Sequence, residues 1–203
     1  MKKELSYLLQ TFVPSIFKNT FLSLRYGCFI HPSAKIYWAR NLKLSRGVRI
    51  GKGVVIMAQK NKKSVVLGKN VVIEDYSIIN NHNGFIEIKD NTTINQYSMI
   101  QSTLDNTVRI GERVAIAPYT RIVPNHSYNG ENRTGTIHAS TEIGNNVWIG
   151  AGVTIVIGVN IGKNSIIGAN SVVTRDIEDN VVAAGTPAKL IKTFQEYVQK
   201  QNS

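Results

Sequence analysis

Apolar residues recur every six positions between residues 143 and 173 without a miss. The run comprises Ile143, Ile149, Ile155, Ile161, Ile167 and Val173. A helix repeats apolar residues every three to four positions and a strand every two, so a strict period of six fits neither. Six residues is the length of a very short strand followed by a tight corner. A chain that turns the same way after each step winds into a prism, which is the hexapeptide form of the β-helix.

Shorter runs with the same period precede this one. They are Ile30 and Ile36; Leu44, Ile50 and Ile56; Leu67, Ile73 and Ile79; Ile88, Ile94 and Ile100; and Ile110, Ile116 and Ile122. Each complete run has three members, so extra residues enter once per three sides, and we expect one edge of the prism to carry loops. The longest insertion predicts a loop over residues 123–142, and a long loop in so economical a chain is typical of a functional site.

The pattern predicts an all-β protein, a parallel β-helix with a short helical segment at each end. Residues 1–28 are expected to form an amphipathic helical segment, because apolar residues spaced by three and four surround an interruption near Pro14. Residues 29–185 form the β-helix. Residues 186–203 form the tail, in which residues 189–201 suit a short closing helix.

The N-terminal segment has three possible roles. It could cap the open end of the prism, pack on a neighbouring subunit, or lie in a membrane interface beside Lys2, Lys3 and Lys18. Open prism ends need capping and favour self-association, so we take the cap as the leading interpretation and keep peripheral membrane contact through residues 1–28 as an alternative.

Composition limits where the protein works. A lone Cys28 excludes a disulfide framework and a cysteine zinc site, and fits a reducing compartment. No stretch of 18 apolar residues is present, and residues 5–17 are too often interrupted by polar residues for a secretory signal. We expect a cytoplasmic protein, with a peripheral location at the inner face of the membrane as an alternative.

The net positive charge of the chain comes from its N-terminal third. Residues 1–70 contain 14 Lys or Arg against Glu4 alone, whereas residues 71–203 contain 10 against 12 Asp or Glu. We call the evenly spaced cations of the first coils the basic collar; they are Arg40, Lys43, Arg46, Arg49 and Lys52. The collar is either a solubilising surface or a site for an anionic partner such as a nucleotide-sugar, an acidic glycan, a lipid pyrophosphate or a membrane. Nucleic acid is not expected, because no recognition helix, zinc spacing or aromatic platform accompanies the charge.

Histidines supply the obvious candidates for chemistry. His31 precedes a proline and suits a structural role, His82 lies in a corner segment, and His126 and His138 lie in the long loop. A three-histidine metal site is an alternative on such a prism, but His138 lies at no coil-related distance from His82 or His126. We therefore expect no metal.

Three segments resemble the hexapeptide-repeat acetyltransferases. They read IGNNVWIGAG over residues 143–152, IGANSVVTRD over 167–176 and AGTPAK over 184–189. The branch that these segments most resemble is the galactoside and maltose acetyltransferase type, with its relatives in bacterial surface-polysaccharide O-acetylation. The first 66 residues lie outside the resemblance. It implies a left-handed parallel β-helix, a homotrimer with active sites between adjacent subunits, and acetyl-CoA as donor.

The resemblance also implies roles for individual residues. His126 matches the general base, Asn95 an asparagine at the acceptor site, Trp148 a tryptophan lining the cleft, and Ala151 a residue whose backbone N–H faces the thioester oxygen. The positions that match CoA-binding residues are Ala169, Thr174, Arg175, Lys189 and Lys192. We assign Asn81 and His82, on the loop-bearing edge, to acceptor binding together with Asn95.

The chemistry agrees with this assignment. Acyl transfer to a hydroxyl needs a base of near-neutral pKa, which histidine provides, and the sequence has no Gly-x-Ser-x-Gly elbow for a covalent route. We therefore predict an acetyl-CoA-dependent O-acetyltransferase acting on a sugar or glycan in surface-polysaccharide assembly (capsule, O-antigen or exopolysaccharide). The positive charge of the first coils makes an anionic or lipid-linked acceptor one option. Two alternatives stay open: an N-acetyltransferase acting on a nucleotide-linked amino sugar, and a non-catalytic trimeric binding module.

Overall fold

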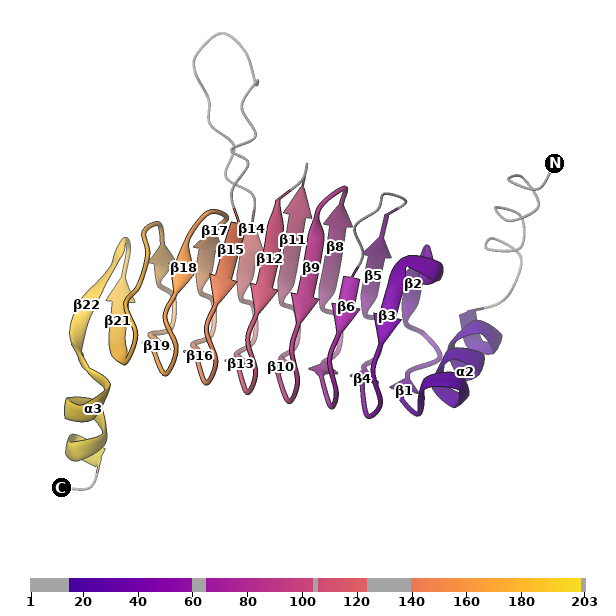
Figure 1. The fold of residues 1–203 in the computed structure, drawn as a ribbon, viewed down its shortest axis with the longest axis horizontal. Helices are drawn as coiled ribbons and strands as arrows, with labels where there is room; N and C mark the ends of the chain where they lie inside the picture. Colours follow the sequence, from indigo (N-terminus) through magenta and orange to yellow (C-terminus); the bar gives the residue numbers. More distant parts are fainter. Residues whose placement is uncertain (1–14, 60–64, 104–105, 124–139, 202–203) are drawn as a thin grey trace, which may run out of the picture.

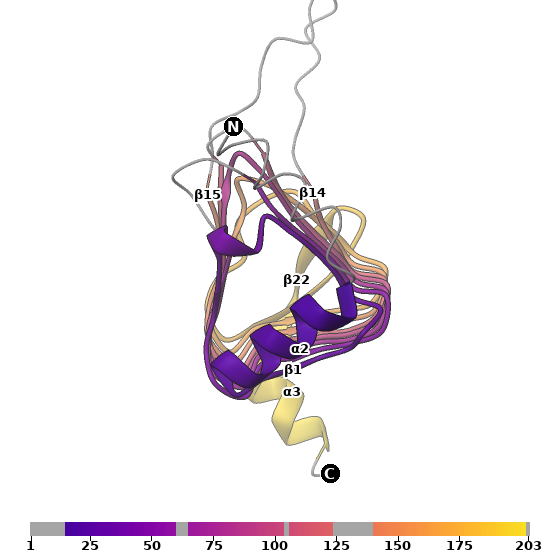
Figure 2. The same ribbon diagram turned by 90° about the vertical axis from the view of Figure 1, so that its right-hand side faces the viewer.

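The six-residue repeat forms the interior of a three-sided column (Figures 1 and 2). The computed structural model describes residues 15–59, 65–103, 106–123 and 140–201, and within them the strands form three sheets. No member of the run from Ile143 to Val173 is more than 3% exposed. Burying one such side chain contributes about 1.5–3 kcal/mol, so the stacked ladder is a main source of the column's stability.

Sheet A forms the first side and includes both strands of the C-terminal end. Its strands are, in order, β1 (Phe29–Ile30), β4 (Arg49–Ile50), β7 (Val72–Ile73), β10 (Thr93–Ile94), β13 (Ala115–Ile116), β16 (Trp148–Ile149), β19 (Ile166–Ile167), β21 (Val181–Gly185) and β22 (Ala188–Thr193). Successive strands are parallel up to β21, and β22 returns antiparallel to it.

Sheets B and C form the other two sides, and their strands are parallel throughout the described residues. Sheet B contains β2 (Lys35–Tyr37), β5 (Val55–Ala58), β8 (Ile78–His82), β11 (Met99–Thr103), β14 (Arg121–Val123), β17 (Thr154–Val156) and β20 (Val172–Val173). Sheet C contains β3 (Leu42–Leu44), β6 (Val65–Leu67), β9 (Phe85–Ile88), β12 (Thr107–Ile110), β15 (Ser140–Ile143) and β18 (Asn160–Ile161). A short 3-10 turn, η1 (Ala39–Asn41), precedes β3.

The corners explain the register of the repeat. Each A–B corner and each C–A corner contains four residues on every described coil, whereas the B–C corners vary in length. The corners of variable length therefore all lie between the strands of sheet B and those of sheet C, along one edge of the column, as the sequence predicts (Figure 1). The strand β15 begins at Ser140, so the connection after β14 is shorter than the predicted loop over 123–142. Residues 124–139, including His126 and His138, lie outside the described residues.

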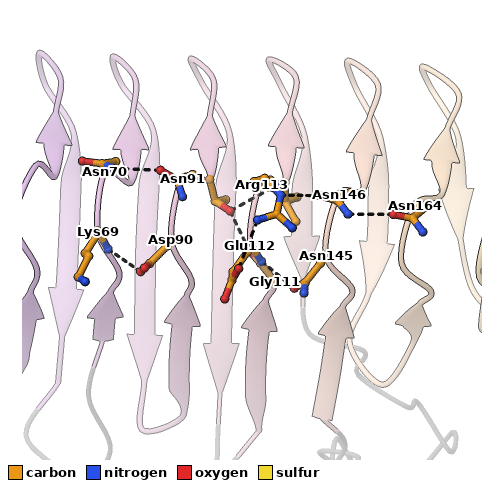
Figure 3. A network of polar contacts seen from close by, with 12 residues as sticks. Lys69, Asn70, Asp90, Asn91, Gly111, Glu112, Arg113, Asn145, Asn146 and Asn164 are labelled. Atoms are coloured by element: carbon orange, nitrogen blue, oxygen red, sulfur yellow. Dashed lines mark hydrogen bonds and ion pairs between the residues drawn. The ribbon is translucent and has the colours of Figure 1, made fainter.

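The C–A corners are held by side chains that repeat on successive coils (Figure 3). Their third residues have positive φ and are mostly asparagine, which tolerates the left-handed conformation better than most residues. Asn146 donates to Asn164, and Asn164 to Asn180, at 2.9 and 2.8 Å. At three of the C–A corners an acidic or amide side chain of the next coil caps the backbone N–H of the second residue. These caps run from Lys69 to Asp90, from Glu112 to Asn145 and from Lys163 to Asp179, at 2.7, 2.9 and 3.0 Å.

The helix α2 (Ser15–Tyr26) lies across the N-terminal end of the column (Figure 2). The Asn19 amide, 1% exposed, donates to the carbonyls of His31 and Ala34 at 3.1 and 2.9 Å. Leu22 and Tyr26 pack against the end of the core. These contacts satisfy carbonyls and cover apolar surface that the first coil would otherwise expose, so α2 caps the column.

The C-terminal end differs in part from the prediction. Residues 189–193, where the sequence predicts the start of the closing helix, instead belong to β22, and the helix α3 (Phe194–Gln201) follows it. The strand β22 pairs with β21 and so covers what would be an open sheet edge. Pairing with the open edge of β21 outweighs the helical spacing of the apolar residues in this segment. Among the described residues, no helix is long and apolar enough to cross a membrane.

Candidate active site

The A–B corners of the last coils expose backbone rather than side chains. Ala151 and Ala169 occupy the second position of successive A–B corners, and both are exposed. The carbonyl of Ala151 accepts from Asn170 N–H at 2.8 Å, which joins the two corners. Within the described residues, the backbone N–H groups of Ala151 and Ala169 have no hydrogen-bond acceptor. The two coils therefore present two open donors on one edge of the column.

The absence of a cap at these corners follows from residue type. At the same corner nearer the N-terminus, the Lys52 N–H donates to Asp75 Oδ1 at 2.7 Å. Ala169 stands one coil after Ala151, as Asp75 stands one coil after Lys52, and a methyl group cannot accept a hydrogen bond. Alanine at position 169 thus leaves the Ala151 N–H open. Gly150 packs against the Ala169 backbone, because a Cβ at Gly150 would lie 2.6 Å from the Ala169 nitrogen.

Trp148 lies beside this pair of donors. It is the first residue of β16, faces outward from sheet A and is 48% exposed. Its neighbours in register are Ala115 and Ile166. An indole three residues before Ala151 gives the open corner an apolar wall on the sheet A side.

Asn95 occupies the first position of an A–B corner nearer the middle of the column. The Asn95 Nδ2 donates to the Ile116 backbone carbonyl at 2.8 Å, and the Asn95 backbone carbonyl accepts from Ser77 Oγ at 2.9 Å. The side-chain amide is therefore held in place by its nitrogen. Its Oδ1 is the atom that remains to meet a ligand.

Asn81 and His82 lie at the C-terminal ends of the sheet B strands, whereas Asn95 lies at their N-terminal ends. They close β8 and pair with Ser102 and Thr103 at the end of β11, whereas Asn95 precedes the start of β11. At about 3.3 Å per strand residue, the two groups are roughly 15–20 Å apart. One chain therefore does not bring the predicted acceptor residues together.

The two residues of this pair differ in accessibility. His82 is exposed, whereas Asn81 is 1% exposed and both polar atoms of its amide lack a hydrogen-bond partner. The Oδ1 of Asn80 and the Oγ1 of Thr103, its neighbours at this corner, are also buried and unpaired. A contact between Asn81 and a sugar would require the loop-bearing corner to open, while His82 needs no such movement.

The predicted CoA-binding residues gather at the C-terminal end. Arg175 and Lys189 line one pocket of about 210 Å³ beside β21 and β22. Thr174 is exposed next to Arg175. The Lys192 ammonium lies 5.2 Å from the centre of the Tyr197 ring, on the side of α3. The structure thus groups two of the three predicted cations and turns the third toward the closing helix.

Comparisons with known proteins agree with this geometry. Residues 140–175 match the family model described as bacterial transferase hexapeptide (six repeats). "Putative acetyltransferase YJL218W" of Saccharomyces cerevisiae is 43% identical over 150 residues, which cover 68% of this chain and 74% of that protein. "Putative lipopolysaccharide biosynthesis O-acetyl transferase WbbJ" of Escherichia coli is 30% identical over 186 residues, 84% of this chain and 78% of that protein. The chain belongs to the hexapeptide-repeat acetyltransferase family.

Two further similarities extend this result. Galactoside O-acetyltransferase of Escherichia coli is 47% identical over 95 residues, 45% of this chain and 47% of that protein, so the chain matches about half of that relative's length. The crystal structure of AntD, an N-acyltransferase from Bacillus cereus in complex with dTDP and 3-hydroxybutyryl-CoA, matches with a TM-score of 0.64 and 19% identity. That match covers 94% of this chain and 100% of that one. At this identity the likeness concerns the fold alone, and it confirms the left-handed parallel β-helix.

A stack of tyrosines on the A–B corner was not predicted from the sequence. Tyr76, Tyr97 and Tyr119 occupy the third position of successive corners, with ring centroids 5.4 and 5.2 Å apart and planes within 10°. Gly53 stands one coil before them, and a Cβ there would lie 2.6 Å from the Tyr76 ring. The signal was available, since each tyrosine follows a ladder isoleucine by three residues. In this family member the stack continues the corner that carries Asn95 and Ala151.

The Lys52 side chain contacts Tyr76, the first tyrosine of the stack. The Lys52 ammonium lies 5.9 Å from the centre of the Tyr76 ring. A hydrogen bond with the Tyr76 hydroxyl raises the pKa of Lys52, with smaller contributions from Asp75 and Tyr97. A lysine is protonated at neutral pH in any case, so the contact sets where the Lys52 ammonium lies and not whether it is charged.

Another groove lies away from these residues. It has a volume of about 620 Å³ and follows the outer face of sheet C. Its charges pair with one another, since Arg109 meets Glu142 at 3.1 Å and Lys163 meets Asp179 at 3.8 Å. None of the predicted site residues lines this groove. In the part of the chain that the structure describes, no cluster of three or more His, Cys, Asp or Glu side chains is placed to hold a metal.

Proposed function

We propose that this protein transfers the acetyl group of acetyl-CoA to a sugar hydroxyl during surface-polysaccharide assembly. The observation that carries the proposal is the open N–H pair of Ala151 and Ala169 on successive corners beside Trp148. Fixed donors that no group of the described residues occupies suit a thioester whose carbonyl oxygen becomes negative during reaction. Membership of the acetyltransferase family supports the same chemistry.

His126 is the general base of the proposed mechanism. It takes the proton of the sugar hydroxyl as the hydroxyl oxygen attacks the thioester carbon. The former carbonyl oxygen then carries negative charge, and the Ala151 N–H donates to it; such a donor contributes about 3 kcal/mol. When the intermediate collapses, the carbon–sulfur bond breaks and the proton on His126 passes to the CoA sulfur.

The C-terminal coils hold CoA in this proposal. Arg175, Lys189 and Lys192 meet its phosphates, because flexible cations on an otherwise near-neutral half of the chain suit a polyanion. Ala169 and Thr174 line the path of the pantetheine arm. A cytoplasmic location follows from the use of acetyl-CoA and agrees with the lone Cys28.

The acceptor side needs a second copy of the chain. Asn95 and His82 lie at opposite ends of sheet B, so a site that uses both corners must be shared between adjacent columns. We therefore propose a homotrimer in which Asn95 on one column faces the loop-bearing edge, with Asn81, His82 and His126, of the next. The acceptor is a sugar of a surface polysaccharide, which is supported by the names of galactoside O-acetyltransferase and the lipopolysaccharide-biosynthesis relative.

The experiment that tests the function is an acetyl-transfer assay against free sugars, nucleotide-sugars and acidic oligosaccharides. We expect a product that gains one acetyl ester on a hydroxyl. The variant His126→Ala should still bind acetyl-CoA but lose turnover by about 10²–10⁴, as expected for a lost general base. An amide product would instead indicate N-acetylation. Near-normal turnover of His126→Ala would remove this histidine from the mechanism, and failure of the parent to bind acetyl-CoA would indicate a binding module.

The same variant tests the shared site. His126→Ala and Asn95→Ala chains are mixed, unfolded and refolded together, so that trimers contain both. In a shared site some interfaces then pair a native His126 with a native Asn95, and activity returns above the sum of the separate variants. A mixture no more active than its parts would place both residues on one chain.

A further inference from the structure

The helix α2 presents two opposite faces. Asn19, Leu22 and Tyr26 face the column and cap it. Phe17, Phe21 and Leu24 recur at i, i+4 and i+7, which places them on one stripe. They are 68%, 60% and 81% exposed. At 100° per residue this stripe is centred about 180° from the capping face, so it points away from the end of the column.

The basic collar surrounds the column directly behind this helix. Arg40 lies at the B–C corner, Lys43 on sheet C, Arg46 at the C–A corner, Arg49 on sheet A and Lys52 at the A–B corner, and all five are exposed. Lys35 adds an exposed cation on sheet B. The first two coils thus carry positive charge on every side and at every corner. No Asp or Glu occurs between Glu4 and Glu74 to offset it.

We infer that this end of the column docks on an anionic membrane surface, with α2 in the interface and the column standing on its N-terminal end. An apolar stripe backed by cations is the arrangement that binds a headgroup layer, because apolar burial and attraction to anionic lipids act together. The exposed Arg25 flanks the stripe on one side of α2, where a long cationic side chain reaches headgroups. The Lys18 ammonium, on the same flank, is instead turned to the column, where it donates to the Ile36 carbonyl. The inference does not depend on the proposed acetyl transfer.

The charge of this end of the column favours a membrane over a second copy of the chain as the partner of the apolar stripe. A second copy joined through the same stripe would bring two basic collars face to face, and like charges across an interface oppose association. An anionic surface has the opposite charge over the whole end of the column. The cap itself is not lost on docking, because the stripe and the capping face are on opposite sides of α2.

Vesicle flotation with the full chain tests the inference. The protein is mixed with vesicles of phosphatidylcholine alone or with about one-third phosphatidylglycerol, at low and high salt. We expect binding only to the anionic vesicles, weakened by about 0.5 M salt because screening shortens the reach of the collar. The double variant Phe17→Ser/Phe21→Ser should bind at least about tenfold more weakly, since two apolar side chains are withdrawn from the interface. The matched control is Ile191→Ser, at the exposed C-terminal end, which should bind like the parent.

A fluorophore reports the orientation. Cys28→Ser removes the lone thiol, and an environment-sensitive label is then attached at Phe21→Cys or Ile191→Cys. Addition of anionic vesicles should shift the emission of the label at 21 to the blue and leave the label at 191 unchanged. Equal shifts at both ends, or a parent that ignores anionic vesicles, would overturn the inference. So would a label at 21 that is already blue-shifted without vesicles, or a parent whose mass in light scattering is twice that of the Phe17→Ser/Phe21→Ser variant.

Discussion

At the scale of single residues, the corner positions decide what each edge of the column does. The second and third residues of a corner set whether backbone N–H groups are capped and whether left-handed φ is tolerated. Arg113 is the exception in the C–A ladder, with φ 53 where its neighbours one coil away are asparagines. Its Nε donates to Asn146 at 2.7 Å. A guanidinium has no acceptor, so it cannot receive the bond that Asn91 could donate.

The variant Arg113→Asn should therefore stabilise the protein. Asparagine adopts positive φ more readily and would complete an amide ladder from Asn70 to Asn180. We expect a gain of about 1 kcal/mol in the free energy of unfolding, since one net hydrogen bond is worth about that much. Urea unfolding measures it.

A control separates the ladder from the ion pair. Arg113 also meets Glu112 at 3.5 Å, in a pair of partly exposed side chains. Glu112→Gln removes that pair alone and should change stability little, because exposed ion pairs contribute at most about 1 kcal/mol. A loss of stability in Arg113→Asn equal to that in Glu112→Gln would show that the ion pair, not the ladder, matters at this corner.

At the scale of elements, the six-residue period predicted the short strands and the single loop-bearing edge. It did so because each ladder residue must face the interior, as Ile149 and Ile155 do, whichever side of the column it occupies. It did not predict β22. This strand forms because it pairs with β21, and the residue types at 188–193 carry no signal of that pairing. The period also says nothing of which column edge approaches another subunit.

The helix α3 offers a test of local capping. The Thr193 N–H donates to Glu196 Oε2 at 2.7 Å, and the Glu196 N–H donates to Thr193 Oγ1 at 3.2 Å, a reciprocal capping box. The bond from the Thr193 N–H lowers the pKa of Glu196, and the Thr193 hydroxyl adds to this. Because the folded pKa is below the unfolded one, the cap is fully formed above the unfolded value of about 4.3 and is lost as pH falls through the folded pKa.

An NMR titration of the Thr193 amide should show this transition. We expect a midpoint below about 4.3, the reference value for glutamate, and no transition in Glu196→Gln, whose amide does not titrate. A midpoint at or above the reference value would contradict the capping box.

At the scale of the whole molecule, the two proposed functions belong to opposite ends of the column: membrane docking to the N-terminal end and acetyl transfer to the C-terminal coils. The N-terminal end carries the charge and the apolar stripe, and the C-terminal coils carry the open donors and the cations for CoA. The family motifs pointed to Trp148, Ala151 and Ala169, whose roles stay predictions. Sequence reasoning could not show that Ala169 leaves the Ala151 N–H uncapped, because the cap joins residues one coil apart. Nor could it show that Asn81 is buried, or that Asn95 lies at the opposite end of the sheet B strands from Asn81.

The central claim is that an open backbone donor at Ala151 stabilises the reacting thioester. The most direct measurement is kcat for acetyl transfer by Ala169→Asn, in which the new amide oxygen caps the Ala151 N–H as Asn145 caps Glu112. Ala169→Val matches the added bulk without an acceptor, and Asp75→Ala uncaps Lys52 far from the reaction. We predict that Ala169→Asn lowers kcat by about 10²–10³, the cost of one lost oxyanion donor, while the thermal midpoint is kept and both controls stay near the parent. Parental kcat in a folded Ala169→Asn, or an equal loss in Ala169→Val, would contradict the account.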